Sequence, residues 1–193
     1  MDRSLYFSTL ADRLNSDELL YVQRAYWLVK EAHRRQKRRL TGERFFEHVR
    51  RVSFMAAVDY GYCDGETAAL GLLHDVVEDT FVPQSVIVNL FGQQMYGWIL
   101  NVSKEIPTFH PVTGNVIARA KLDEAAFYKA LMTAHLKPRI IKGCDRIDNL
   151  ADLISWETPR REKYIIETNM YHVPLALQTD ARIAKEIENR LKI

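Results

Sequence analysis

Apolar residues recur every three or four positions through most of the chain, which is the spacing of one face of an α-helix. Residues 15–18, Asn-Ser-Asp-Glu, have the composition of a helix N-terminal cap. Pro83 suits the first turn of a helix, and Gly61 and Gly92 stand where helical patterns stop. We therefore predict helices at about 19–32, 43–60, 65–80, 83–91, 93–105, 120–134, 138–156, 160–171 and 175–191.

The same pattern indicates a single domain. No part of the sequence suggests a strand-rich domain, an internal repeat or an interdomain linker. Residues 106–115, with Pro107, Pro111 and Gly114, are predicted to form an irregular loop. A chain of 193 residues is long enough for one sizeable core. We therefore expect an all-α, single-domain bundle of roughly nine helices over residues 1–193, with a site assembled from several helices.

Composition excludes several classes of protein. No apolar run approaches the ~20 residues that span a bilayer, and the N-terminus lacks the layout of a signal peptide. Cys63 and Cys144 are far apart and have no CxxC spacing, so neither a disulfide scaffold nor a zinc knuckle is expected. We therefore predict a cytoplasmic protein without a membrane partner.

The most informative stretch is His74-Asp75-Val-Val-Glu78-Asp79-Thr, which lies inside an apolar run. Residues four apart share a helix face, so a continuous helix would place His74 over Glu78 and Asp75 over Asp79. Such a buried cluster is costly unless a metal or a hydrogen-bond network compensates it. The motif therefore predicts a metal-dependent hydrolase.

Two other segments supply matching side chains. His48 follows two aromatic residues at the start of a helical pattern, and Asp145 and Asn149 interrupt the apolar face of another. With His74 and Asp75, the residues His48 and Asp145 would form a mixed nitrogen and oxygen set. Such a set suits Mn²⁺, Fe²⁺, Zn²⁺ or Co²⁺ and suits Ca²⁺ poorly.

Positive charge is concentrated before His48. Residues 33–51 contain eight Lys or Arg and two Glu, a local charge of +6, whereas the whole chain carries +2 and the remainder therefore −4. The run can be a solvated helix end, where cations complement the macrodipole, or a phosphate-binding rim that leads into the site. Nucleic-acid binding is the weaker interpretation, because no aromatic residues interleave with the basic run.

From about residue 32 to residue 176 the chain resembles the HD superfamily, and within it the (p)ppGpp hydrolase domain of RelA/SpoT-like proteins. It resembles the small, stand-alone alarmone hydrolases of that family, so we expect no synthetase activity. Beyond the HDVVEDT block, the matching segments are Leu90-Phe91-Gly92, Val102-Ser103-Lys104, Lys142 to Asn149 (similar to K-L-A-D-R-L-H-N), Glu167-Thr168 and Pro174-Leu175-Ala176.

The resemblance implies a metal site and a catalytic pair. It implies one Mn²⁺ per chain, with other divalent transition metals possible, and it implies that Glu78 and Asp79 orient and deprotonate the attacking water. Asn149 aligns with a residue near the sugar and phosphates. Arg146 can anchor a glutamate or phosphate oxygens, or form a structural salt bridge. The implied metal ligands are His48, His74, Asp75 and Asp145.

The substrate pocket departs from the family pattern. The Arg-Lys pair of the family falls on Arg39 and Leu40, so the lysine is missing. The residues that could replace its charge are Lys37, Arg38 and Arg44. Two prolines of the family are Arg44 and Val49 here, and the Arg-Thr after the asparagine is Ala151-Asp152. The resemblance therefore implies an intact metal site beside an altered substrate pocket.

Three functions follow from these observations. The first is a Mn²⁺-dependent guanosine-3′,5′-bis(diphosphate) 3′-pyrophosphohydrolase, which would bind a guanosine nucleotide, release pyrophosphate and return GDP or GTP. The second is an HD phosphohydrolase of another nucleotide, such as an NADPH phosphatase or a 5′-nucleotidase. The third is a non-catalytic nucleotide- or RNA-binding module. Assembly into a homo-oligomer stays open.

Overall fold

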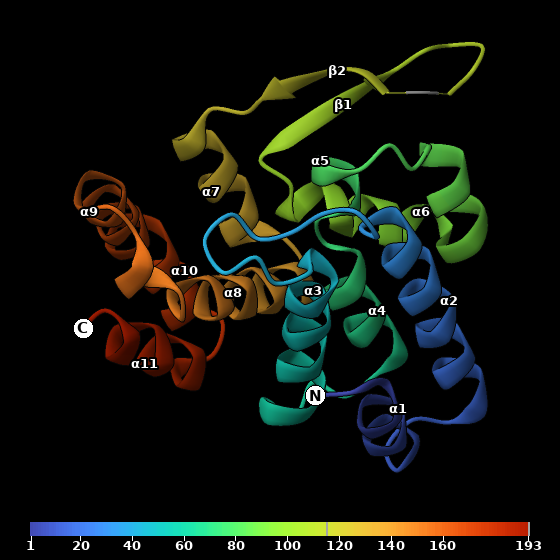
Figure 1. The fold of residues 1–193 in the computed structure, drawn as a ribbon, viewed down its shortest axis with the longest axis horizontal. Coiled ribbons are helices and arrows are strands. Elements are labelled where there is room, and N and C mark those ends of the chain that lie inside the picture. Colours follow the sequence, from blue (N-terminus) through green and yellow to red (C-terminus); the bar gives the residue numbers. More distant parts are fainter. Residues whose placement is uncertain (115, 193) are drawn as a thin grey trace.

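The computed structural model describes residues 1–114 and 116–192, which form a helical bundle with one small β-hairpin (Figure 1). Nine of its α-helices have nine residues or more. Their bounds are α1 Arg3–Ala11, α2 Ser16–Ala32, α3 Phe45–Phe54, α4 Gly65–Leu73, α6 Gln84–Val102, α7 Glu124–Thr133, α8 Leu136–Leu150, α9 Thr158–Glu167 and α11 Ala181–Arg190. Two single-turn helices, α5 Val76–Asp79 and α10 Val173–Leu177, complete the set, and the all-α prediction is confirmed.

Local sequence signals explain most helix boundaries. The Asn15 side chain accepts hydrogen bonds from the first turn of α2, and the Glu18 carboxylate accepts one from the Asn15 backbone N–H, which completes a capping box. Gly92 interrupts α6 with a φ of 86°, a conformation that favours glycine, so the predicted break between two helices is present as a kink. Helix α1 was not predicted; the Asp2 side chain caps it.

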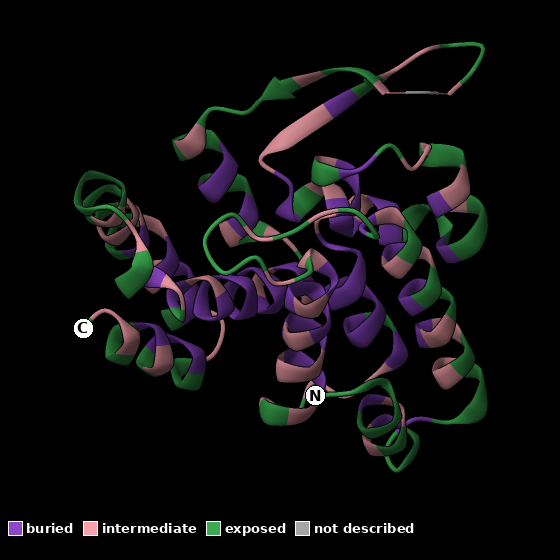
Figure 2. Ribbon diagram, viewed as in Figure 1, coloured by how far each residue is buried: buried purple, intermediate pink, exposed green. Residues whose placement is uncertain are grey.

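Helix α8 is the centre of the bundle. It packs against α3, α4, α6 and α11, and most of its residues are buried (Figure 2). The buried residues include the charged side chains Lys142, Asp145, Arg146 and Asp148 in addition to its apolar ones. Charges are buried in a helix of this kind only where partners compensate them, so α8 already marks the position of a polar site.

Helices α3 and α4 approach each other closely at Ser53 and Gly71. The Ser53 hydroxyl accepts or donates a hydrogen bond with Tyr6 at 2.7 Å and donates one to the Ala68 carbonyl at 2.7 Å. A Cβ atom on Gly71 would lie 2.5 Å from the Ser53 Cα, so only glycine permits this spacing. The contact brings together the two helices that lead to His48 and His74.

The predicted loop at 106–115 is wrong at residues 106–109, which belong to a strand, and residues 110–114 form the turn that follows it. Strands β1 Glu105–Phe109 and β2 Val116–Lys121 pair antiparallel, with Glu105 opposite Lys121. Pro107 lies within β1, where a two-stranded ribbon leaves one edge unpaired and so tolerates a residue without an N–H. The turn contains Gly114 at a φ of 68°; Asn115, the last residue of the predicted loop, lies outside the described residues.

Several predicted helices are shorter than expected. The helix predicted at 120–134 begins at Glu124, because β2 extends to Lys121 and Asp123 then caps α7. The helix predicted at 138–156 ends at Leu150, and a 3₁₀ turn, Leu153–Ser155, follows it. The helix predicted at 175–191 is divided between α10 and α11. No helix of the described residues has the length and apolar character required to cross a membrane.

The contact between α3 and α4 predicts opposite effects for two glycine substitutions. Gly71→Ala should lower the free energy of unfolding by about 1–3 kcal/mol, because the new methyl group meets the backbone of Ser53. Gly97→Ala in α6 is the control: its methyl group would meet no atom within 4 Å, and it should stabilise the helix by up to about 1 kcal/mol. Chemical denaturation measures both; equal destabilisation by the two variants would contradict the close approach.

Candidate metal centre

Three separate parts of the fold bring four candidate ligand atoms together. His48 comes from α3, Asp145 from α8, and His74 and Asp75 from the turn between α4 and α5. Ligand atoms of His48, His74 and Asp145 lie within 4.8 Å of one another. Asp75 Oδ2 lies 3.1 Å from His74 Nε2 and 3.5 Å from His48 Nε2. All four side chains predicted as metal ligands therefore meet at one point.

Hydrogen bonds leave both imidazoles ready to bind a cation. His48 Nδ1 lies 2.7 Å from Asp148 Oδ2, and His74 Nδ1 lies 2.8 Å from the Gly71 carbonyl oxygen. Because each acceptor requires a proton on Nδ1, the lone pair of each ring is on Nε2, which faces the cluster. His74 Nε2 is buried and has no hydrogen-bond partner in the described residues. The donor set therefore fits a divalent transition metal.

The electrostatics of the cluster also require a cation. Burial opposes charge on His74, yet Asp75 and Asp145 raise its pKa to about 9. Burial likewise opposes charge on His48, but hydrogen bonds with Asp145, Asp148 and Asp75 raise its pKa well above the usual value. The carboxylates thus bind positive charge strongly, and a divalent ion can replace the protons on the two rings.

The predicted continuous helix through the His74-Asp75 motif is wrong, and its interruption creates the cluster. Helix α4 ends at Leu73, Asp75 has φ −98° and ψ 0°, and α5 starts at Val76. Neighbouring side chains on a regular helix point about 100° apart, since one turn takes 3.6 residues. The break lets His74 and Asp75 turn toward the same point.

Glu78 and Asp79 lie beside the cluster and line the same cleft, which has a volume of about 280 Å³. Glu78 Oε2 accepts a hydrogen bond from the Lys104 backbone at 3.0 Å, and burial raises the pKa of Glu78. Asp79 is exposed at the mouth of the cleft. The pKa of Asp79 is raised to about 7, first because the surrounding protein removes water from the carboxyl group and then because of the charges of Asp75 and Glu78. Solvent partly screens this effect, since the side chain is exposed.

Basic side chains form the opposite wall of this cleft. Lys142 Nζ lies 3.3 Å from Asp145 Oδ2 and donates to the Val102 carbonyl at 3.0 Å. Arg146 Nη2 pairs with Glu167 at 2.5 Å, and the Arg146 guanidinium lies 3.8 Å from the centre of the Tyr164 ring. Arg146 is therefore held in a buried ion pair next to the metal cluster.

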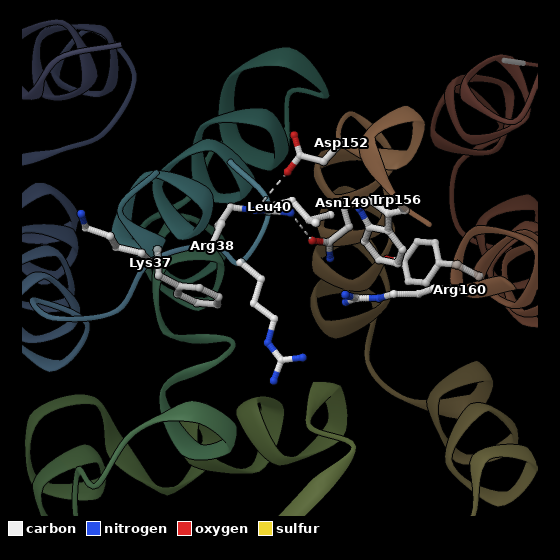
Figure 3. A pocket seen from close by; sticks show the side chains of 10 residues that line it. Lys37, Arg38, Leu40, Asn149, Asp152, Trp156 and Arg160 are labelled. Carbon is white, nitrogen blue, oxygen red and sulfur yellow. Dashed lines mark hydrogen bonds and ion pairs between the residues drawn. The ribbon is translucent and has the colours of Figure 1, made fainter. Parts of the chain in front are cut away.

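A second cavity of about 350 Å³ opens from the metal cleft. The two share Phe45, Asn149 and Tyr164. The rest of the second cavity is formed by residues 37–40 of the basic run and by the segment from the end of α8 to the start of α9. Its lining residues include Lys37, Arg38, Arg39, Leu40, Asp152, Trp156 and Arg160 (Figure 3). The Arg160 guanidinium lies 4.1 Å from the centre of the Trp156 ring. The two cavities together can accommodate a ligand with an anionic end and a planar end.

The structure separates the predicted basic rim into different environments. Arg39 and Leu40 are exposed along the second cavity. Arg38 instead turns inward onto α8, while Arg44 pairs with Glu47 outside both cavities at 3.3 Å. Lys37 points away from Trp156 and Arg160 (Figure 3). Arg39 is thus the predicted rim residue whose position best matches a ligand contact.

Sequence reasoning missed Asp148, Lys142 and Trp156. Asp148 takes the place of the histidine in the K-L-A-D-R-L-H-N pattern, which was a signal that this part of the site differs. Lys142 was visible one helical turn before Asp145 as a charge on the same buried face. Trp156 lies beyond the recognised motifs, and no pattern in the sequence connects it to the site.

The sequence matches a known protein family over most of its length. Residues 25–181 match the HD domain family. The chain belongs to this family. Its sequence is 34% identical over 158 residues to the guanosine-3′,5′-bis(diphosphate) 3′-pyrophosphohydrolase of Aquifex aeolicus, a match that covers 80% of this chain and 21% of the relative. The chain therefore spans about a fifth of the length of that relative, and of several others that it matches.

A smaller relative is similar over most of its own length. The guanosine-3′,5′-bis(diphosphate) 3′-pyrophosphohydrolase MESH1 of Drosophila melanogaster is 29% identical over 140 residues, which cover 69% of this chain and 73% of the relative. A solved structure described as a metazoan ortholog of SpoT superimposes with a TM-score of 0.73 and 22% identity, over 89% of this chain and 94% of that one. The resemblance to (p)ppGpp hydrolase domains of this HD family is thereby confirmed.

The ligand geometry predicts one divalent ion per chain. After treatment with a chelator, added Mn²⁺ should bind with a stoichiometry of one and raise the unfolding temperature by linkage. His74→Ala or Asp145→Ala should weaken Mn²⁺ binding by at least about 10-fold, the effect of losing even an outer-shell partner. His110→Ala, in the hairpin turn, is the control. Calorimetric titration of each variant checks this, and unchanged affinity in both ligand variants would contradict the site.

Proposed function

We propose that this protein is a Mn²⁺-dependent guanosine-3′,5′-bis(diphosphate) 3′-pyrophosphohydrolase. The observation that carries the proposal is a four-residue cluster suited to a divalent ion beside two carboxylates with raised pKa values, Glu78 and Asp79. The names of the relatives from Aquifex and Drosophila support the choice of substrate. Synthesis of the alarmone is not part of the proposal.

The ligands in this proposal are His48, His74, Asp75 and Asp145. A bound divalent ion would polarise a phosphate oxygen and lower the pKa of a water molecule. Glu78 has one oxygen fixed by the Lys104 backbone, so its other oxygen can orient the attacking water. Asp79, with a pKa near neutrality, is suited to accept the proton of that water.

The reaction breaks the bond between the 3′ oxygen and the adjacent phosphorus. Water supplies a hydroxyl group to the phosphorus, and the 3′ oxygen takes a proton, so the products are pyrophosphate and GDP or GTP. Lys142 and Arg146 in the cleft wall offset the negative charge of the diphosphate. Because Asn149 lines both cavities, we assign it to the sugar that joins the two ends of the nucleotide.

In the second cavity we assign the base to the neighbourhood of Arg39. Arg39 is exposed along this cavity, so its guanidinium can stack on a purine. Leu40, which stands where the family has a lysine, is 45% exposed and offers no charge. A chain that lacks this cation gives specific support to the second candidate, an HD phosphohydrolase of another nucleotide. Assays of the Mn²⁺-loaded protein against ppGpp, NADPH and a panel of nucleoside monophosphates separate the two.

The acidic pair provides the test of mechanism. Glu78→Gln and Asp79→Asn keep the shape of each side chain but lose the charge that activates water. We expect kcat to fall by about 10²-fold or more while Mn²⁺ still binds. Glu66→Gln, on the exposed side of α4, is the control and should leave kcat unchanged. Normal turnover by both cleft variants would show that the pair is structural.

The second cavity provides the test of substrate identity. Arg39→Ala should raise KM for ppGpp with a smaller effect on kcat, because stacking and phosphate contacts are mainly ground-state binding. Arg24→Ala, an exposed residue of α2, should change neither. Leu40→Lys restores the cation of the family and should improve ppGpp hydrolysis or leave it unchanged. If Leu40→Lys slows turnover of the best substrate, another nucleotide is the better assignment.

A further inference from the structure

Arg38 leaves the basic segment and reaches inward to the end of α8. Its Nη1 donates to Asp148 Oδ2 at 3.1 Å, and its Nη2 donates to Asn149 Oδ1 at 2.8 Å. Its Nε lies 3.2 Å from Asp152 Oδ2. Figure 3 shows Arg38 between Asn149 and Asp152, with both interactions drawn. Only 11% of the side chain is exposed, so this guanidinium makes its contacts with the protein rather than with solvent.

Two of these three partners touch candidate metal ligands. Asp148 Oδ2 also lies 2.7 Å from His48 Nδ1, and Asn149 Nδ2 donates to Asp145 Oδ1 at 2.6 Å. One guanidinium is therefore connected, through a single side chain each, to an imidazole from α3 and a carboxylate from α8. These two ligands come from different helices, and Arg38 comes from neither.

The charges around Asp148 are arranged to keep it ionised. Arg51 binds Asp148 Oδ1 through Nε at 2.6 Å, and Glu43 in turn pairs with Arg51 at 2.7 Å. An ionised Asp148 holds the proton on His48 Nδ1 and increases the basicity of Nε2.

We propose that Arg38 is a positioning residue of the metal centre, which sets His48 through Asp148 and Asp145 through Asn149. Asp152 pairs with the third nitrogen of the guanidinium, Nε, and so fixes the plane of the group. This assigns a role to the two acids, Asp148 and Asp152, that depart from the family pattern. The inference rests on the proposed metal site, and it removes Arg38 from the group of candidate phosphate contacts.

The geometry requires the planar fork of arginine. Asp148 and Asn149 accept from two different nitrogens, Nη1 and Nη2, while Nε faces Asp152. A lysine at position 38 would keep the charge but present a single nitrogen, which cannot reach all three acceptors in these directions. The effect of the positive charge at position 38 can therefore be separated by experiment from the effect of the arginine geometry.

The test is calorimetric titration of Mn²⁺ into chelator-treated protein, accompanied by thermal unfolding without metal. Arg38→Ala and Arg38→Lys should each weaken Mn²⁺ binding by about 10-fold or more, as other outer-shell changes do. Asp148→Asn should have a similar effect. The double variant Arg38→Ala/Asp148→Asn should be less impaired than the product of the two single effects, because both act through His48.

Arg190→Ala is the matched control. Arg190, at the end of α11, pairs with Glu186 of the same helix at 2.7 Å and donates to the Ile147 carbonyl of α8 at 3.2 Å. Neither contact involves a candidate ligand or a partner of one. Arg190→Ala should lower thermal stability and leave Mn²⁺ affinity unchanged. The proposal is overturned if Arg38→Lys binds Mn²⁺ as the unaltered protein does, or if Arg190→Ala weakens binding equally. If the unaltered protein bound no Mn²⁺, the proposed metal site itself would be wrong.

Discussion

The structure depends on compensation of buried negative charge. Asp75, Asp145 and Asp148 lie around two buried imidazoles, and removing such carboxylates from water has a large desolvation cost. The negative charge can be balanced by protons on the rings, by a divalent ion and by the surrounding arginines. The burial of most of α8 is tolerated for the same reason, since its buried charges have partners: Lys142 pairs with Asp145, Asp148 with His48, and Arg146 with Glu167.

Much of this arrangement could be predicted from the sequence. The period of apolar residues gave the helical class, and the cap at residues 15–18 gave the start of α2. The ligand residues could be named because histidines and aspartates interrupt apolar helix faces, where their burial demands a reason. What these signals have in common is that they are local: each depends on residues within about two helical turns.

The features that could not be predicted depend on contacts between distant segments. The pairing of β1 with β2 was hidden by Pro107, Pro111 and Gly114, which usually mark irregular loops. The break between α4 and α5 is imposed by convergence on a shared point, against a good helical pattern. Arg38 was interpreted from the sequence as a possible phosphate contact, because its actual partners lie more than 100 residues away. The position of Trp156 in the second cavity could not be predicted for the same reason.

The base of the hairpin has a consequence for how this fold can change. The Lys104 N–H, just before β1, binds Glu78, and Arg119 of β2 donates to the Thr80 carbonyl at 2.5 Å. The start of β1 and the side chain of a β2 residue are thus both bonded to the C-terminal end of α5, which carries the acidic pair. Insertions and deletions at the tip can therefore accumulate in evolution without reaching the cleft. Inserting or deleting a single residue at the base would shift the register of the ribbon against α5. Chain length is therefore constrained at the base and free at the tip.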